Sequence, residues 1–421
     1  MAVGIENPAF VAEYAAAVAA DWENGSEDGN NLFQLLTWQR GKFPSVVTGA
    51  ALDEVASRLD GSDLAMIFAP RDQPQHLPCF PQLCSLLGIP SQFVSESLQS
   101  VTHSFGLRRL ANGTHTSWLH LLSNVSSDPQ QHTSWARFGV VMTVSPVPSK
   151  GRNRVVMICF EAPEAFCRSV SSLVRSNDWQ DVLKDPYLLY AMVFEAWYEV
   201  VDNGTWNVLD LAREEEIDIF QQAQSLSKNQ TAPLAIDYER IHHIAKEALF
   251  LIEGVDAATR TLDCVSQAHR CVFQGPAVAL NAVQDALAHR REVLASTRLR
   301  LTSLDQRIKN TINLAFNVRT LRDSNVMRED SYVMKTLAVL AMIFLPTSTV
   351  SSIFGMQFFN AVADQDSTVI SMRVSHQFWV FWAVAIPFTS AVLIGWTFWI
   401  KRFQRRVPRV DVERGTIPSP T

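Results

Sequence analysis

Five hydroxyl side chains stand close together in an uncharged stretch near the C-terminal end of this chain, namely Thr347, Ser348, Thr349, Ser351 and Ser352. A hydroxyl can accept a hydrogen bond from water bound to a cation. Such outer-shell contacts suit magnesium, which is small and dehydrates reluctantly. The same side chains can instead bond to the carbonyl four residues earlier, and could satisfy groups freed by Pro346. The residues by themselves leave both uses open.

The hydroxyls belong to one of two apolar stretches, Thr336–Phe354 and Phe378–Ile400, neither of which contains a charged residue. Each stretch is close to the ~20 residues with which a helix crosses the hydrocarbon core. The second carries tryptophans toward its ends, where interfacial aromatic belts occur, at Trp379, Trp382, Trp396 and Trp399. The pattern predicts a membrane protein with two C-terminal spans and a large part outside the bilayer.

Basic residues flank the two stretches on the sides away from the connecting loop, which itself holds only Arg373. They are Arg319, Arg322, Arg328 and Lys335 before the first stretch, and Lys401, Arg402, Arg405, Arg406 and Arg409 after the second. Because lysine and arginine favour the cytoplasmic side, we expect both termini in the cytoplasm. The early sequence is acidic, and the first arginine is Arg40, so the plasma membrane or vacuole is expected rather than the mitochondrial inner membrane.

The rest of the composition narrows the function classes. The net charge of −6 argues against nucleic acid as a partner. The sequence contains no GxxxxGK(S/T), HExxH or GxSxG motif, so neither nucleotide-driven pumping nor an enzyme is expected. No resident cofactor is expected. The six cysteines lack zinc-ribbon spacing, and on a cytoplasmic side they would be reduced thiols.

We expect an α+β cytosolic domain, a long helical stalk and two transmembrane helices. The predicted segments are 1–165 (α/β), 166–275 (helical), 276–335 (stalk helix), 336–357 (first span), 358–377 (outer loop), 378–400 (second span) and 401–421 (basic tail). Apolar runs bounded by turn residues predict strands at Leu64–Phe68, Ser117–Leu122, Arg137–Val144 and Arg154–Phe160. Two candidate helices follow, Pro186–Val201 and Val208–Leu226, and the second carries an acidic cluster at Glu214, Glu215, Glu216 and Asp218. That cluster is either a solvated face or a cation-attracting surface.

A heptad row runs along the predicted stalk, formed by Leu280, Leu287, Leu294, Leu301, Ile308 and Ala315. A second row is only partly apolar, because Arg290, Thr297 and Thr311 interrupt it. A sustained heptad predicts a long helix packing along a partner, here in a loose bundle rather than a tight two-stranded coiled coil. Such a helix, entering the first span without a break signal, could couple the cytosolic body to the membrane.

The first span also carries a motif pattern: Met334-Lys335-x-Leu337, then Ile343-Phe344-Leu345-Pro346-Thr347, then Ile353-Phe354-Gly355-Met356-Gln357-Phe358. This resembles the CorA-like divalent-cation (magnesium) transporter family, and more closely its divergent fungal branch. The close match covers about 25 residues of the span, and the layout extends it to roughly a third of the chain. The family has Gly-Met-Asn where this chain has Gly355, Met356 and Gln357.

The resemblance implies a homopentamer in the lipid bilayer that conducts divalent cations, magnesium above all, along five first spans. By the same resemblance, Gly355, Met356 and Gln357 form the outer selectivity mouth, with Gln357 as an outer-shell contact to the hydrated cation. Ser348 and Ser352 line the pore, and Met334 and Leu337 form a hydrophobic gate. The alternative is a non-conducting, membrane-anchored regulatory or signalling protein that retains the fold. The loop acids Asp364 and Asp366 could concentrate cations or could merely be solvated.

Overall fold

The computed structural model describes residues 33–70, 79–99, 101, 103–125, 134–147, 152–175, 179–228, 233–273, 277–362, 371–374, 376 and 378–404. The chain forms two compact units. The N-terminal unit comprises residues 1–225 and 234–318, and the C-terminal unit comprises residues 226–233 and 319–421. Each unit is described separately below.

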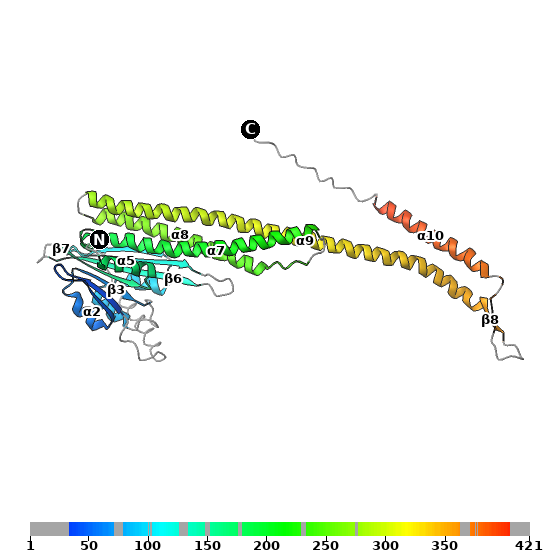
Figure 1. Ribbon diagram of the computed structural model, residues 1–421, viewed down its shortest axis with the longest axis horizontal. Coiled ribbons are helices and arrows are strands. Elements are labelled where there is room, and N and C mark those ends of the chain that lie inside the picture. The colour runs from blue at the N-terminus through cyan, green and yellow to red at the C-terminus, as the bar shows by residue number, and fades with distance from the viewer. Residues whose placement is uncertain are drawn as a thin grey trace, which may run out of the picture. The chain divides into compact units, whose positions relative to one another are not determined.

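A seven-stranded sheet in the order β2-β1-β3-β7-β6-β5-β4 forms the base of the N-terminal unit (Figure 1). All neighbouring strands are antiparallel except β3 and β7. The strands are β1 Phe33–Trp38, β2 Ser45–Ala50, β3 Leu64–Ala69, β4 His103–Arg109, β5 His115–Asn124, β6 Trp135–Val147 and β7 Arg152–Phe160. The four predicted strands correspond to β3, β5, β6 and β7, whereas β1, β2 and β4 were not foreseen.

The two faces of the sheet bury different cores, because successive side chains along a strand point to opposite sides. On β1, Leu35 belongs to one core and Leu36 to the other, and on β3 the same holds for Ile67 and Met66. The smaller core is closed by the short helices α2 Leu52–Leu59, α3 Phe80–Leu87 and α4 Ser91–Leu98. The larger core lies under α5 Glu164–Arg175, α6 Trp179–Lys184 and three long helices.

The first long helix, α7 Leu188–Lys228, is continuous, so the prediction of two helices separated near Asp202–Asn207 was wrong. Asn203-Gly204 has the local character of a turn, but Gly204 is there for packing. A Cβ at Gly204 would lie 3.0 Å from the Asn124 carbonyl oxygen, at the end of β5. On α8 Tyr238–Val272, a Cβ at Gly254 would lie 3.3 Å from the Leu122 carbonyl oxygen. The two glycines let both helices approach the end of β5 closely.

The third long helix is α9 Ala277–Phe358, and its heptad row packs within the same chain. Leu287, Leu294, Leu301, Ile308 and Ala315 are all buried in the core that α7 and α8 also form. The bundle was predicted, but its partners are α7 and α8. The row is therefore no argument for assembly with other copies.

Arginines on α9 reinforce this packing by pairing with carboxylates of both neighbouring helices, which run beside α9 in Figure 1. Three arginines form ion pairs with carboxylates of α7: Arg290 with Glu195 at 2.8 Å, Arg300 with Asp202 at 2.8 Å and Arg307 with Glu216 at 2.5 Å. Two others form ion pairs with α8, Arg291 with Asp263 and Arg298 with Asp256, both at 2.7 Å. Arg290, which interrupts the second apolar row in the sequence, thus forms an ion pair between α9 and α7.

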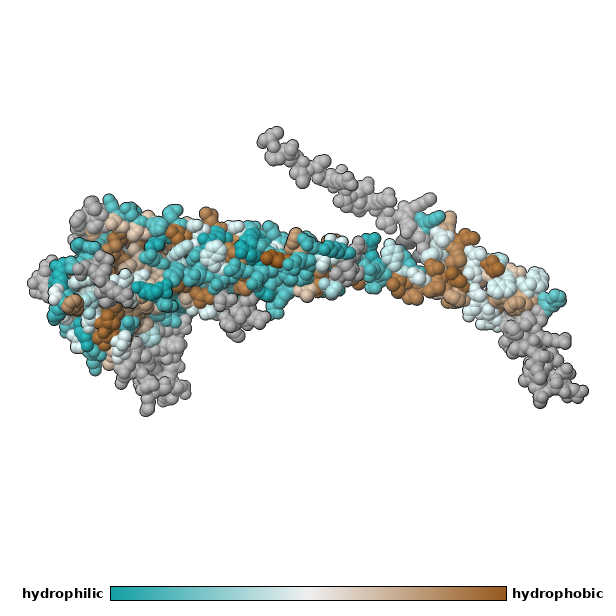
Figure 2. All heavy atoms as spheres, viewed as in Figure 1, coloured by the Kyte–Doolittle hydropathy of each residue, from teal (hydrophilic) through white to brown (hydrophobic). Residues whose placement is uncertain are grey.

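In the C-terminal unit, the last part of α9 is followed by a short antiparallel pair, β8 Phe359–Val362 and β9 Ser371–Val374, and then by α10 Phe378–Gln404. The pairing of Phe359 with Val374 sets the start of this hairpin, which the sequence did not reveal. Each helix contains an internal proline, Pro346 in α9 and Pro387 in α10. Figure 2 shows hydrophobic residues gathered on the visible surface of this unit.

Candidate functional site on helix α9

All seven residues predicted to act on a cation lie on α9. Met334, Leu337, Ser348, Ser352 and Gly355 are separated by three, eleven, four and three positions along this helix. At 3.6 residues per turn, these spacings confine the five positions to about 60° of arc. One face of the helix therefore carries apolar side chains at one end and hydroxyls toward the other. We call it the serine face.

The serine face is uncovered in the chain. Met334 is 66% exposed and Leu337 56% exposed, and both Ser348 and Ser352 are exposed. The contact between α9 and α10 lies elsewhere on the helix, where Val350 packs against Phe381 and Ala385. Because Val350 is two residues from both serines, it points about 160° to 200° away from them. Helix α10 thus covers the back of α9 and leaves the serine face free for another surface.

The hydroxyls of this span bond back to their own helix. The Oγ of Ser352 donates to the Ser348 carbonyl oxygen at 2.9 Å. Thr347 donates to Ile343 at 2.9 Å, and Thr349 donates to Leu345 at 2.8 Å. The second of the two uses expected from the sequence, back-bonding to the helix, is thus present. A hydroxyl that donates in this way still has lone pairs that can accept.

The predicted outer mouth lies where α9 ends. Gly355, Met356 and Gln357 are in the last turn of the helix, directly before β8. The side chains from Phe354 to Asn360 lie outside what the structure describes, as do Asp364 and Asp366. The helical backbone here is observed, and the role of Gln357 stays a prediction.

In the acidic cluster on α7, arginines pair with three of the four carboxylates, while Glu214 and Asp218 remain exposed. Arg240 on α8 pairs with Glu214 at 3.0 Å and with Glu215 at 2.9 Å. Burial raises the pKa of Glu215, and the nearby Arg240 opposes that rise. Together with the Arg307 pair to Glu216, these contacts tie the three long helices together. The cluster is structural.

Two properties of helices α9 and α10, the length of their apolar windows and the exposure of those windows, define the class of protein. Helices α9 and α10 each contain a window long and apolar enough to cross a membrane, and only 6% and 11% of those windows are buried within the chain. A core helix of a soluble protein would be mostly buried. The chain is a membrane protein with two spanning helices that follow the N-terminal α/β and helical unit in the sequence.

The family follows from the sequence comparison. Residues 185–402, more than half of the chain, match the family described as CorA-like Mg2+ transporter protein. The chain therefore belongs to this family. The match confirms the family to which the first-span motifs pointed, whereas the fungal branch and the Gly355-Met356-Gln357 motif stay predictions.

The individual proteins that the chain is similar to share little sequence identity with it. The chain is 28% identical over 225 residues to the "Notoamide biosynthesis cluster protein M'" of Aspergillus versicolor, in a match that covers 49% of this chain and spans 47% of that protein. Among solved structures, it is similar to the CorA magnesium transporter of Methanocaldococcus jannaschii (10% identity, TM-score 0.48, covering 89% of this chain and 98% of that one). It is also similar to the full-length CmaX protein (15% identity, TM-score 0.46, covering 91% and 99%).

Proposed function

We propose that copies of this chain assemble into a homo-oligomer, a pentamer as the family resemblance implies, that conducts Mg2+ along the serine faces of its first spans. One observation carries the proposal: the serine face is exposed, while α10 packs on the opposite side of α9 at Val350. A hairpin of two helices cannot enclose a polar path, so the hydroxyls of several copies would have to face a common axis.

The chemistry of the serine face suits a hydrated divalent cation. Magnesium usually keeps several of its waters, and those waters present hydrogen-bond donors outward. Ser348 and Ser352 can accept such hydrogen bonds without stripping the ion. Met334 and Leu337, at the other end of the face, would form an apolar ring. A narrow apolar ring closes a pore by expelling water.

At the outer mouth, the amide oxygen of Gln357 would accept hydrogen bonds from the hydrated ion, as the Asn of the family motif does by resemblance. Glutamine has one methylene more than asparagine, so the diameter of the ring and the order of its side chains change. We therefore expect transport with altered selectivity, with Gly355 and Met356 shaping the backbone at the mouth.

The conduction route is tested by adding bulk on and off the serine face. Purified protein would be reconstituted into liposomes containing a magnesium-sensitive dye. Ser348→Leu should abolish most magnesium influx, because five leucines would narrow the path. Thr347→Leu is the matched control, since the same side chain one position earlier points about 100° away. Equal flux through both variants and the wild type would refute the route.

A second candidate is a membrane-anchored regulatory protein that retains the fold without conducting. The replacement of the motif asparagine by Gln357 favours it, and so does the relative named for a biosynthesis cluster. The same liposome assay distinguishes this candidate from the channel. Wild-type protein that purifies as a ring-sized oligomer yet passes no divalent cation would support the regulatory candidate and refute the channel.

We propose that both termini face the cytoplasm, in the plasma membrane or the vacuolar membrane. The sequons at Asn112 and Asn203 provide the test, because both lie in the N-terminal unit at exposed positions. They should carry no glycan when the protein is made in a eukaryotic cell, and digestion with a glycosidase should leave its electrophoretic mobility unchanged. A glycosidase-sensitive shift that disappears in Asn112→Gln would reverse the orientation.

A further inference from the structure

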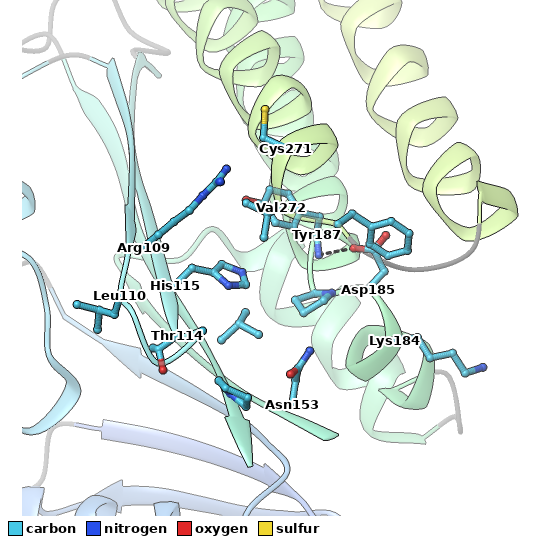
Figure 3. Close-up of a pocket in the computed structure, with 15 residues that line it drawn as sticks. Arg109, Leu110, Thr114, His115, Asn153, Lys184, Asp185, Tyr187, Cys271 and Val272 are labelled. Atoms are coloured by element: carbon cyan, nitrogen blue, oxygen red, sulfur yellow. Dashed lines mark hydrogen bonds between the residues drawn. The ribbon is translucent and has the colours of Figure 1, made fainter. Parts of the chain in front are cut away.

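A cavity of about 570 Å³ lies in the N-terminal unit, far along the sequence from the serine face. The β4–β5 hairpin forms one side of it, and the α6–α7 junction with the end of α8 forms the other (Figure 3). Its polar lining includes Arg109, His115, Asn153, Asp185, Tyr187 and Cys271. The volume falls within the range of small-molecule sites.

The hairpin turn fixes two basic side chains side by side. Leu110 N–H donates to the Thr114 carbonyl at 2.8 Å, and Gly113 adopts φ +84°, a conformation that glycine tolerates. The Asn112 side chain accepts from Thr114 N–H at 3.0 Å, which closes the turn. As a result, Arg109 and His115 are directly opposite each other in the antiparallel register.

This arrangement disfavours a positive charge on His115. Burial lowers the pKa of His115, and the Arg109 charge lowers it further. Like charges directly opposite on neighbouring strands destabilise a sheet. Within the described residues, no carboxylate pairs with the Arg109 guanidinium, and Figure 3 shows this side chain directed toward Cys271 across the cavity.

The other charges of the cavity are already engaged. Asp185 accepts from the Tyr187 N–H at 3.0 Å and contacts His269 Nε2 at 2.9 Å. Gln284 donates to His269 Nδ1 at 2.8 Å, which leaves Nε2 as the donor to Asp185. Lys184 pairs with Asp181 at 2.6 Å and points away from Arg109 in Figure 3. Meanwhile the buried Tyr187 hydroxyl has no hydrogen-bond partner among the described residues.

We propose that this cavity binds a small phosphate-bearing anion between the Arg109 guanidinium and the His115 imidazole. A phosphate group offers several acceptor oxygens and up to two negative charges, which match the two basic groups that the turn holds together. The remaining volume accommodates an organic part of about nucleoside size. The site lies outside the spans, so it would act on the protein without lying in the cation path.

The test is isothermal titration of the purified full-length protein with two probes, inorganic phosphate and AMP. Wild-type protein should bind at least one of them saturably. Arg109→Gln should weaken binding about tenfold or more, as expected for loss of a charged hydrogen bond, and His115→Gln should weaken it less. Arg58→Gln is the matched control, because Arg58 is exposed and pairs with Glu54 on its own helix. Its affinity should equal that of the wild type.

The pair of probes separates the sources of the phosphate group. Tighter binding of AMP points to an organic phosphate, and equal affinity points to free phosphate. Absence of saturable binding of both probes up to about 10 mM, a concentration that reveals even weak sites, would overturn the proposal. So would unchanged affinity in Arg109→Gln. Thermal melts without ligand are a second measurement: a large loss of melting temperature in Arg109→Gln would assign Arg109 a structural role and overturn the site.

Discussion

Replacing Leu301 by alanine should destabilise the N-terminal unit strongly, because the heptad row is packed within the chain. Leu301 is 0% exposed in the core shared by α7, α8 and α9. Truncating a fully buried leucine costs about 2–5 kcal/mol, from lost transfer energy and the cavity left behind. In a unit of this size, each kcal/mol shifts the melting temperature by roughly 2 °C. The expected loss is therefore about 4–10 °C.

Thermal unfolding of the full-length protein, followed by circular dichroism and by limited proteolysis, measures this loss. Leu299→Ala is the matched control: the same substitution, two residues away on the same helix, at a side chain that is 73% exposed. It should change the melting temperature by less than about 1 °C. If Leu301→Ala left the melting temperature unchanged and instead dissociated the oligomer, the row would pack between copies and our reasoning would be wrong.

Three further predictions concern residues of α9. Thr297→Val should raise the melting temperature. The Thr297 hydroxyl is buried without a hydrogen-bond partner among the described residues, and removing it should relieve a cost of about 1–3 kcal/mol. A lower melting temperature in this variant would contradict the prediction. Leu337→Asn should wet the proposed gate and raise the open probability in single-channel recordings, whereas an unaltered open probability would count against the gate. Gln357→Asn should preserve or increase magnesium flux and Gln357→Ala should lower it, and equal flux in all three proteins would remove Gln357 from the outer mouth.

The strands that the sequence revealed are those at the centre of the sheet. β3, β6 and β7 are buried on both faces and read as continuous apolar runs. The two edge strands, β2 and β4, are half exposed and contain glycine, serine or arginine. Edge strands are often polar, which protects a sheet from pairing with other chains but also removes the apolar signal.

The break expected in α7 shows a different limit of prediction from the sequence. Asn203-Gly204 has the local character of a turn, and local propensity was the only guide. The reason for a glycine there is the Asn124 carbonyl, more than seventy positions earlier in the sequence. Contacts over that separation decide whether a glycine ends a helix or lets it pack closely, and no pattern within the helix records them.

The candidate site was predictable to a similar extent. Residue spacing alone places Met334, Leu337, Ser348 and Ser352 on one face of a helix. It could not show that α10 covers Val350 on the other side, because both faces of the span are apolar enough to pack. The hairpin of β8 and β9 was missed, since strands of four residues carry too little pattern to be recognised.

Back-bonding by the hydroxyls and lining of a magnesium path are compatible, and Ser352 shows why. Its hydrogen is given to the Ser348 carbonyl, so the oxygen presents only lone pairs to the exposed side of the helix. The waters around Mg2+ point their hydrogens outward and need acceptors. The helix carbonyl thus fixes the polarity that a hydrated cation requires. Ser352→Thr, which keeps an oxygen with the same local bond, should retain magnesium flux in liposomes, whereas Ser352→Val, of similar shape to threonine but without the oxygen, should reduce it severalfold. If both variants conducted equally, the hydroxyl would have no part in holding the ion, and bulk alone would define the path.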